Sequence, residues 1–190
     1  MSQANLHAVD WSKLPAPEDD GAAAHLMRRA LPALVLPASD GSQIDISKLD
    51  GRTVVFIYPM MGKPGVSLPE GWDDIPGARG CTPQSCAFRD LHAELLASGP
   101  ARVFGLSTQT PDDQREAAER LHLPFALLSD ASLAMTSALS LPTMHAAGQT
   151  LLKRITLILD DTRITKVFYP VFPPDRNAGN VLVWLKDNPV

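Results

Sequence analysis

Residues 52–59 read RTVVFIYP, and this run of β-branched and aromatic residues decides the fold. A run of this kind, without alternating polar residues, is typical of a strand that is buried on both faces of a sheet. It is followed at residues 60–80 by a long loop rich in glycine and proline. Because loops of this length inside a compact domain are usually functional, the sequence predicts a buried strand that leads into a functional loop.

Further strands and helices alternate along the chain on both sides of this segment. The patterns predict strands at residues 43–47, 101–107, 125–130, 151–161 and 162–171, and helices from Pro83 onward for about 15 residues, at 111–122, at 131–140 and at 175–187. Their order, ββαβαβαββα, is typical of a sheet covered by helices. We therefore expect an α/β protein with a thioredoxin-like fold, in which a central mixed β-sheet is flanked by helices.

The length and charge of the chain limit its organisation and its partners. A chain of 190 residues has the size of one domain with an appendage. Residues 1–27 are rich in proline, alanine and acidic side chains and predict an N-terminal extension anchored on the body by Trp11 and Leu14, so that residues 28–190 form the thioredoxin-like domain. The formal net charge is −4 and no long basic run occurs, which argues against nucleic acid or an anionic membrane as a partner.

The apolar segments indicate where the protein works. No apolar stretch approaches the roughly 20 residues that a membrane-spanning helix needs. Residues 1–10 lack the positive charge and the apolar core of a secretory signal. We therefore expect a cytoplasmic protein. Thiols are kept reduced in that compartment, and a close pair of cysteines there is more often catalytic or metal-binding than structural.

Residues 77–86, GARGCTPQSC, hold the two cysteines of the chain, Cys81 and Cys86. Thr82 is a good helix N-cap and Pro83 a good first helical residue, which places Cys81 at the mouth of a helix. Free backbone N–H groups and the helix dipole favour a thiolate at that position. Cys81 is therefore the candidate nucleophile, whereas Cys86 lies one turn into the helix and is the weaker candidate.

The residues alone also allow other interpretations of the cysteine pair. Lone cysteines are often small buried hydrophobes. A zinc site is disfavoured because it needs four ligands and no histidine lies near enough to complete a short motif, so we expect no metal. Nothing in the sequence connects a histidine with Cys81, as a Cys–His hydrolase would require. Arg79, two residues before Cys81, adds positive charge that would favour a redox-active thiolate.

The segments FIYP at 56–59 and GCTPQSCAFRD at 80–90 resemble the active-site region of peroxiredoxins. The likeness is greatest to the subgroup called peroxiredoxin Q, or bacterioferritin comigratory protein. It continues through VFGLS, LPFALLSD and KRITLILDDTRI, in the order of the family's later strands, over about residues 30–170. The resemblance implies a thioredoxin fold, reduction of hydroperoxides without a cofactor, a thioredoxin-type dithiol as the reductant, and a monomer or homodimer.

The resemblance also assigns roles to the thiols and to one arginine. Cys81 matches the peroxidatic cysteine, which attacks the peroxide and becomes a sulfenic acid. Cys86 matches the resolving cysteine, which condenses with it to a disulfide. Arg154 matches the active-site arginine of the family, whose charge favours the thiolate and polarises the peroxide. The alternative for Arg154 is a surface charge at a strand edge.

Around these residues the sequence both follows and departs from the family pattern. Pro59, Gly80 and Thr82 match family residues that contact the substrate. Ala78, however, stands where the family has a threonine or serine three residues before the peroxidatic cysteine, and Pro59 lies 22 positions before Cys81, so a long insertion separates them. We expect a hydroxyl from this insertion, with Ser67 as the first candidate, to replace the missing one. The alternatives are that a backbone N–H or Thr82 takes over its role, or that the site is a less efficient peroxidase.

The spacing of the two cysteines has a mechanical consequence. In an unbroken helix, five steps of about 100° place the side chains roughly 140° apart around the axis, with a rise of about 7.5 Å. A disulfide needs Cα atoms within about 7 Å and converging Cβ vectors. We therefore expect residues 81–88 to be helical when reduced and unwound when oxidised. The same two states would also suit a non-enzymatic redox switch, which is the alternative to a peroxidase.

Overall fold

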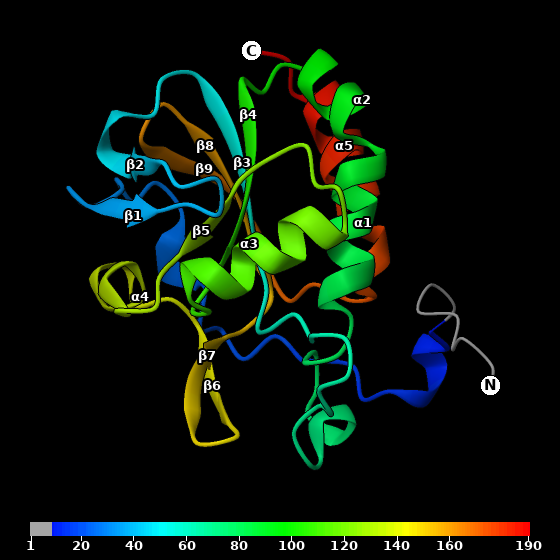
Figure 1. Cartoon of the computed structure of the whole chain (residues 1–190). Coiled ribbons are helices and arrows are strands. Elements are labelled where there is room, and N and C mark those ends of the chain that lie inside the picture. Colours follow the sequence, from blue (N-terminus) through cyan, green and yellow to red (C-terminus); the bar gives the residue numbers. More distant parts are fainter. Residues whose placement is uncertain (1–8) are drawn as a thin grey trace.

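A five-stranded mixed sheet forms the centre of the molecule (Figure 1). The computed structural model describes residues 9–190; residues 1–8, which belong to the predicted extension and to the stretch without a secretory signal, lie outside the described residues. The sheet order is β5-β4-β3-β8-β9, with β3 Arg52–Ile57, β4 Arg102–Ser107, β5 Leu127–Ser129, β8 Ile155–Asp160 and β9 Arg163–Phe168. Strands β3, β4 and β5 are parallel, whereas β8 is antiparallel to both β3 and β9. The predicted α/β class and mixed sheet are confirmed.

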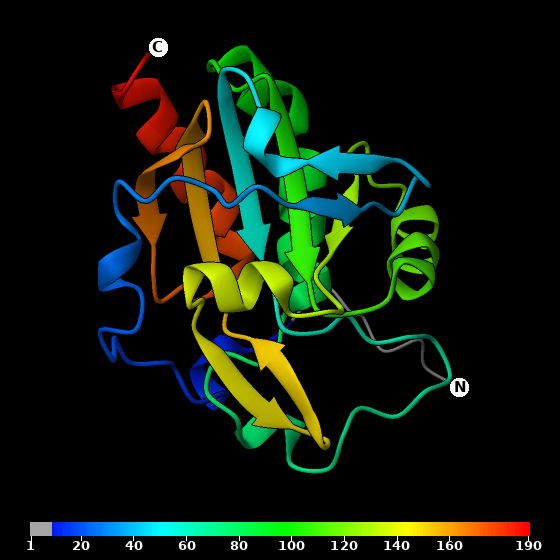
Figure 2. The ribbon, with the colours of Figure 1, turned by 90° about the vertical axis from the view of Figure 1, so that its left-hand side faces the viewer.

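Helices and two hairpins surround the sheet (Figures 1 and 2). The helices are α1 Cys81–Asp90, α2 His92–Ala97, α3 Pro111–Arg120, α4 Ala134–Leu139 and α5 Asn177–Asp187. The hairpins are β1 Val35–Pro37 with β2 Gln43–Asp45, and β6 Thr143–Ala146 with β7 Gln149–Leu152. Helices α1, α2 and α5 lie together on one side of the sheet, and the first hairpin and α4 lie on the other. This arrangement is the thioredoxin-like fold.

Strand β3 is buried because its side chains enter two separate cores. Val55 and Ile57 belong to the cluster shared with the first hairpin and α4, whereas Val54 and Phe56 belong to the cluster shared with α1 and α5. The ring of Phe56 stacks on Phe88 of α1 with centroids 4.2 Å apart. The continuous apolar run at 52–59 therefore follows from a strand covered on both faces.

The structure corrects three expectations about the elements. Of the strand expected at residues 43–47, only Gln43–Asp45 forms, as β2, which pairs with β1 outside the central sheet, and Ile46–Lys48 is a 3-10 helix. The run expected as one strand at 151–161 is divided between β7 and β8, and the hairpin that β7 forms turns at Gly148, whose φ of +69° favours glycine. The helix expected from Pro83 begins earlier, at Cys81, and is interrupted at Leu91 between α1 and α2.

The N-terminal segment packs closely on the body. Leu26 is fully buried in the core. The Asp20 carboxylate pairs with the Lys153 ammonium at 2.6 Å and accepts a hydrogen bond from the Tyr169 hydroxyl at 2.7 Å. These two contacts hold the pKa of Asp20 well below its usual range. A division of the chain at residue 28 stays a prediction, and the structure shows that the residues before it contribute to the core.

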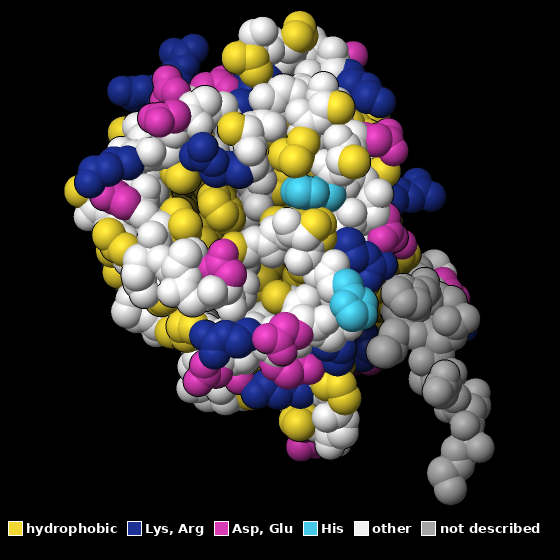
Figure 3. Space-filling view, turned by 45° about the horizontal axis from the view of Figure 1, so that its top comes forward, with side chains coloured by type: hydrophobic (Ala, Val, Ile, Leu, Met, Phe, Trp, Pro, Cys, Tyr) yellow, Lys and Arg dark blue, Asp and Glu magenta, His cyan; other side chains and the backbone are white. Residues whose placement is uncertain are grey.

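The surface carries mixed charges. On the face seen in Figure 3, acidic and basic side chains lie side by side, with hydrophobic side chains scattered among them. Across the part of the chain that the structure describes, no helix has both the length and the apolar composition needed to cross a membrane.

Packing between β4 and its neighbours predicts opposite effects for two glycine-to-alanine substitutions. A Cβ at Gly105 would lie 2.5 Å from Leu127 Cδ2 and 2.8 Å from Phe56 Cζ, whereas a Cβ at Gly179 in α5 meets nothing within 4 Å. Gly105→Ala should therefore lower the free energy of unfolding by about 1–3 kcal/mol through overpacking. Gly179→Ala should raise it by up to about 1 kcal/mol through helix propensity. Urea unfolding measures both, and a neutral Gly105→Ala would contradict the packing described here.

Candidate active site

The sheet topology brings Cys81 and Arg154 to the same edge. Strand β3 ends at Ile57, and the chain returns from the loop at Cys81, the first residue of α1. Strand β8 is antiparallel to β3, and its first residue, Ile155, pairs with Ile57. Arg154 therefore lies at the carboxyl edge of the parallel strands, where sites of open α/β sheets gather. Both side chains are buried, with 4% of Cys81 and 3% of Arg154 exposed.

The Arg154 guanidinium binds the sulfur and the turn that precedes it. Its Nη2 lies 3.3 Å from Cys81 Sγ and donates to the carbonyl oxygens of Gly77 at 3.3 Å, Ala78 at 3.2 Å and Arg79 at 3.1 Å. Arg154 is therefore a buried charge and not a surface charge at a strand edge. Its position fixes the backbone just before α1 and sets a positive charge against the sulfur.

A chain of hydrogen bonds between buried polar side chains holds the other side of the guanidinium. Arg154 Nη1 donates to Gln84 Oε1, Gln84 Nε2 donates to Asn177 Oδ1 at 2.9 Å, and the Thr156 hydroxyl donates to the same Asn177 oxygen at 2.7 Å. All four side chains are buried. The sequence reading missed Gln84 and Asn177. A signal for Gln84 existed, because it lies three residues after Cys81, on the same helix face.

Among the described residues, the partners found for Arg154 include no carboxylate. Its Nε is buried without a hydrogen-bond partner among those residues as well. A buried guanidinium surrounded by neutral carbonyl and amide groups lacks a counter-ion. The Cys81 sulfur, 3.3 Å from Nη2, is the nucleophilic side-chain atom in contact with this cation.

Gly80 defines how α1 begins. Gly80 is the N-cap with φ of +105°, and a Cβ on it would collide with Pro174 Cγ and lie 2.7 Å from Trp11 Cη2. Glycine is required here by both the backbone conformation and the lack of space. Thr82 is therefore not the N-cap, which corrects the sequence expectation. Cys81 occupies the first helical position, where backbone N–H groups lack helical partners.

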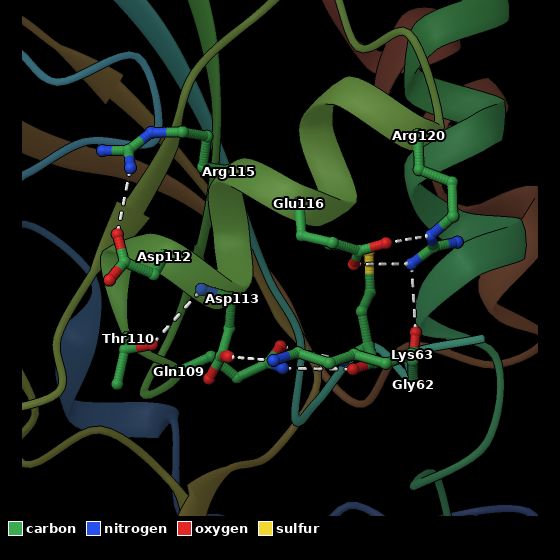
Figure 4. Close-up of polar contacts among 10 residues, drawn as sticks. Gly62, Lys63, Gln109, Thr110, Asp112, Asp113, Arg115, Glu116 and Arg120 are labelled. Atoms are coloured by element: carbon green, nitrogen blue, oxygen red, sulfur yellow. Dashed lines mark hydrogen bonds and ion pairs between the residues drawn. The ribbon is translucent and has the colours of Figure 1, made fainter. Parts of the chain in front are cut away.

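A cavity of about 580 Å³ opens at Cys81. Its lining includes Thr82, Arg120 and the apolar side chains of Met60, Leu68 and Trp72. Polar contacts hold residues 61–63, at the beginning of the loop that borders this cavity, against α3 and the residues just before it (Figure 4). These join Met61 with Gln109, Lys63 with Asp113, and Arg120 with both the Gly62 carbonyl and Glu116. The first part of this loop, at residues 61–63, is therefore anchored on α3.

The structure brings some predicted residues to Cys81 and leaves others away from it. Thr82 and Gly80 line the cavity, and Pro59 is buried beyond the end of β3. Ser67 is exposed and lies outside the described lining, although the residues on both sides of it line the cavity. The replacement of the missing hydroxyl by Ser67 therefore stays a prediction.

Two other groups near the cysteines are also placed. Arg79 forms an ion pair with Asp73 at 2.9 Å, so its charge is already neutralised. Cys86 is 4% exposed, and burial raises the pKa of its thiol against the opposing charge of Arg89. Both thiols are free, and both lie within the single helix α1.

Comparisons with known proteins agree on one family. A family model described as Redoxin matches residues 27–182. Peroxiredoxin Bcp of Escherichia coli K12 is 31% identical over 162 residues, which cover 83% of this chain and 93% of that one. Chloroplastic peroxiredoxin Q of Populus jackii is 31% identical over 160 residues, and that of Oryza sativa subsp. japonica is 32% identical over 155 residues; the chain spans 67% and 63% of their lengths.

Solved structures give the same answer for the fold. Peroxidoxin BcpB of Mycobacterium tuberculosis superposes with a TM-score of 0.68 at 25% identity, covering 86% of this chain and 98% of that one. Peroxiredoxin Q of Xanthomonas campestris superposes with a TM-score of 0.63 at 20% identity, covering 93% and 97%.

The contacts of Arg154 predict how Cys81 reacts with an alkylating agent. In a Cys86→Ser background, Arg154→Ala should slow alkylation of Cys81 at neutral pH by about tenfold or more, because the fixed charge beside the sulfur is lost. Arg154→Lys should restore only part of the rate, since a point charge lacks the planar fork. Arg79→Ala is the control and should change the rate less, because solvent screens the partly exposed Arg79–Asp73 pair, whereas Arg154 is buried against the sulfur. Equal rates for the two alanine variants, both folded by circular dichroism, would place Arg154 outside the reaction.

Proposed function

This chain belongs to the redoxin family, in its peroxiredoxin Q and Bcp branch, and we propose that it reduces hydroperoxides at Cys81 with Arg154 as the stabilising cation. Peroxiredoxins are thiol-dependent peroxidases, and the chain is accordingly an enzyme of the oxidoreductase class. The observation that carries the assignment of residues is the 3.3 Å contact between Arg154 Nη2 and Cys81 Sγ at the start of α1.

The first step is nucleophilic attack on the peroxide. The Cys81 thiolate attacks one oxygen, so that a sulfur–oxygen bond forms while the oxygen–oxygen bond breaks. The second oxygen leaves as alkoxide or hydroxide and takes up a proton from water to become the alcohol or water, and the sulfur is oxidised to a sulfenic acid. Arg154 supports this step twice, because it favours the thiolate and because its N–H groups can donate to the peroxide oxygens as charge shifts onto them.

The second step joins the two thiols. Cys86 attacks the Cys81 sulfur, a disulfide forms, and the sulfenic oxygen leaves as water. As α1 stands, the residues are separated by a rise of about 7.5 Å and face different directions, so the first turns of the helix must unwind. Pro83 eases this change because it has no backbone N–H to lose. Burial in the helix raises the pKa of the Cys86 thiol and so keeps it protonated. The thiol becomes reactive when the segment opens and the burial is lost.

A dithiol protein of the thioredoxin type then restores both thiols. This reductant is proposed from the pair of cysteines, since exchange with a dithiol returns an intramolecular disulfide to the reduced state. A monomer or homodimer stays a prediction. A cytoplasmic location also stays a prediction, and the names of the plant relatives place those proteins in chloroplasts.

The cavity supports both small and larger peroxides. Its apolar side chains, Met60, Leu68 and Trp72, suit an alkyl group next to the reacting sulfur. A structure of the Xanthomonas campestris bacterioferritin comigratory protein is described in terms of alkyl peroxide reduction by that protein. We therefore include organic hydroperoxides with hydrogen peroxide as substrates. Thr82, which lines the cavity, is a candidate to supply the hydroxyl that is missing because residue 78 is an alanine.

Turnover with thioredoxin, thioredoxin reductase and NADPH tests the proposal. Cys81→Ser should abolish peroxide consumption, because the nucleophile is missing. Cys86→Ser should react once per chain and stop as the sulfenic acid, which mass spectrometry detects as one added oxygen. Oxidation of Cys86 in the Cys81→Ser variant at the wild-type rate would refute the assignment. A wild-type chain that forms the disulfide reversibly without sustained turnover would instead support a redox switch.

A further inference from the structure

The N-terminal segment reaches the start of α1 through Trp11. Trp11 lies in a 3-10 turn, Trp11–Lys13, that the Asp10 side chain caps. The indole Nε1 donates to Asp175 Oδ2 at 2.8 Å, and the indole ring meets Phe172 edge-on with centroids 6.1 Å apart. Trp11 is thus tied to the segment that precedes α5.

Trp11 and Pro174 together enclose the backbone at Gly80. A Cβ on Gly80 would lie 2.7 Å from Trp11 Cη2 and would collide with Pro174 Cγ. Gly80 is the N-cap of α1 and is bonded directly to Cys81. The same N-terminal segment also forms one wall of the cavity at Cys81, through Val9, Asp10, Lys13 and Leu14. The start of the reactive helix is therefore packed under a tryptophan from a distant part of the chain.

We propose that Trp11 is a positioning residue that latches the first turn of α1 and must release before Cys86 can reach Cys81. The proposal rests on the proposed function, since it concerns the unwinding step of that reaction. When the first turn unwinds, Gly80 and Cys81 move, and Trp11 and Pro174 fill the space on the side of Gly80 where a Cβ would stand. The Trp11–Asp175 hydrogen bond and the ring contacts therefore stabilise the helical state against the unwound one.

The latch governs a competition between two fates of the sulfenic acid. In one, Cys86 displaces the sulfenic oxygen as water and the disulfide forms. In the other, a second hydroperoxide transfers one oxygen to the sulfur, which becomes a sulfinic acid while the peroxide leaves as the alcohol. A latch that delays unwinding leaves more time for the second fate. Trp11 thus sets the peroxide concentration at which Cys81 is lost to overoxidation.

Three variants and a control test the latch. Trp11→Ala removes the ring, Trp11→Phe keeps a ring without the N–H donor, and Asp175→Ala removes the acceptor. Trp184→Phe is the matched control, because that indole lies on α5 against Arg52. Rapid mixing with one equivalent of hydrogen peroxide, followed by acid quench and mass spectrometry, separates sulfenic acid, disulfide and sulfinic acid.

Disulfide formation in Trp11→Ala should be at least about tenfold faster than in the wild type, because the variant loses a hydrogen bond to a charged group and an aromatic contact that both favour the helical state. Trp11→Phe and Asp175→Ala should be intermediate, and Trp184→Phe unchanged. Sulfenic acid formation should stay within about twofold in all of them, since Trp11 makes no bond to the sulfur or to Arg154. The fraction of sulfinic acid at high peroxide should fall as disulfide formation accelerates.

Unchanged or slower disulfide formation in both Trp11→Ala and Asp175→Ala would overturn the latch. If Trp11→Ala does not fold, Asp175→Ala and Trp11→Phe alone decide between faster and unchanged formation. A wild-type chain that forms no disulfide would refute the proposed function itself. A wild-type chain that forms it normally, at the rate of the variants, would refute only the latch.

Discussion

A buried guanidinium organises this molecule around one sulfur atom. Burying a charge is costly unless polar groups and an opposite charge surround it. Arg154 donates hydrogen bonds to three carbonyl oxygens of the turn at residues 77–79 and to the side-chain amide oxygen of Gln84. The left-handed Gly80 and the start of α1 at Cys81 follow from the position of that turn. The guanidinium also contacts the Cys81 sulfur, so the same side chain shapes the backbone and lies beside the reacting atom.

Much of this arrangement could be predicted from the sequence because its signals are local. The apolar run at 52–59 requires a strand covered on both faces, and the pair Cys81 and Cys86 lies within one short motif. Arg154 was found through the family resemblance. Its burial agrees with the apolar residues that follow it along β8.

The features that the sequence reading missed depend on contacts between distant residues. The hydrogen bond from Gln84 to Asn177 joins residues that are 93 positions apart in the sequence, and the hydrogen bond from Trp11 to Asp175 joins residues that are 164 positions apart. Periodicity within a window carries no information on such pairs. Ser67 is a candidate because it is a hydroxyl in the insertion, and its position relative to the sulfur depends on how the whole loop at residues 60–80 folds, which no local pattern gives.

The central claim is that one helix must satisfy two incompatible demands. Folded, α1 holds Cys81 beside Arg154 and keeps Cys86 buried; unwound, it allows the two sulfurs to meet. Folded proteins commonly open locally at the ends of helices, where the free energy of opening is small. Here such opening would be a step of the reaction, controlled by the groups that pack on Gly80.

Amide hydrogen exchange on the fully reduced and the disulfide forms tests this claim most directly. The backbone amides of residues 84–88 should be protected in the reduced protein, because the helix pairs them, and should exchange fast after oxidation. The strands β3 and β8 should keep their protection in both forms, which controls for global unfolding. Equal protection of residues 84–88 in the two forms, with the Cys81–Cys86 disulfide confirmed by mass spectrometry, would contradict the account.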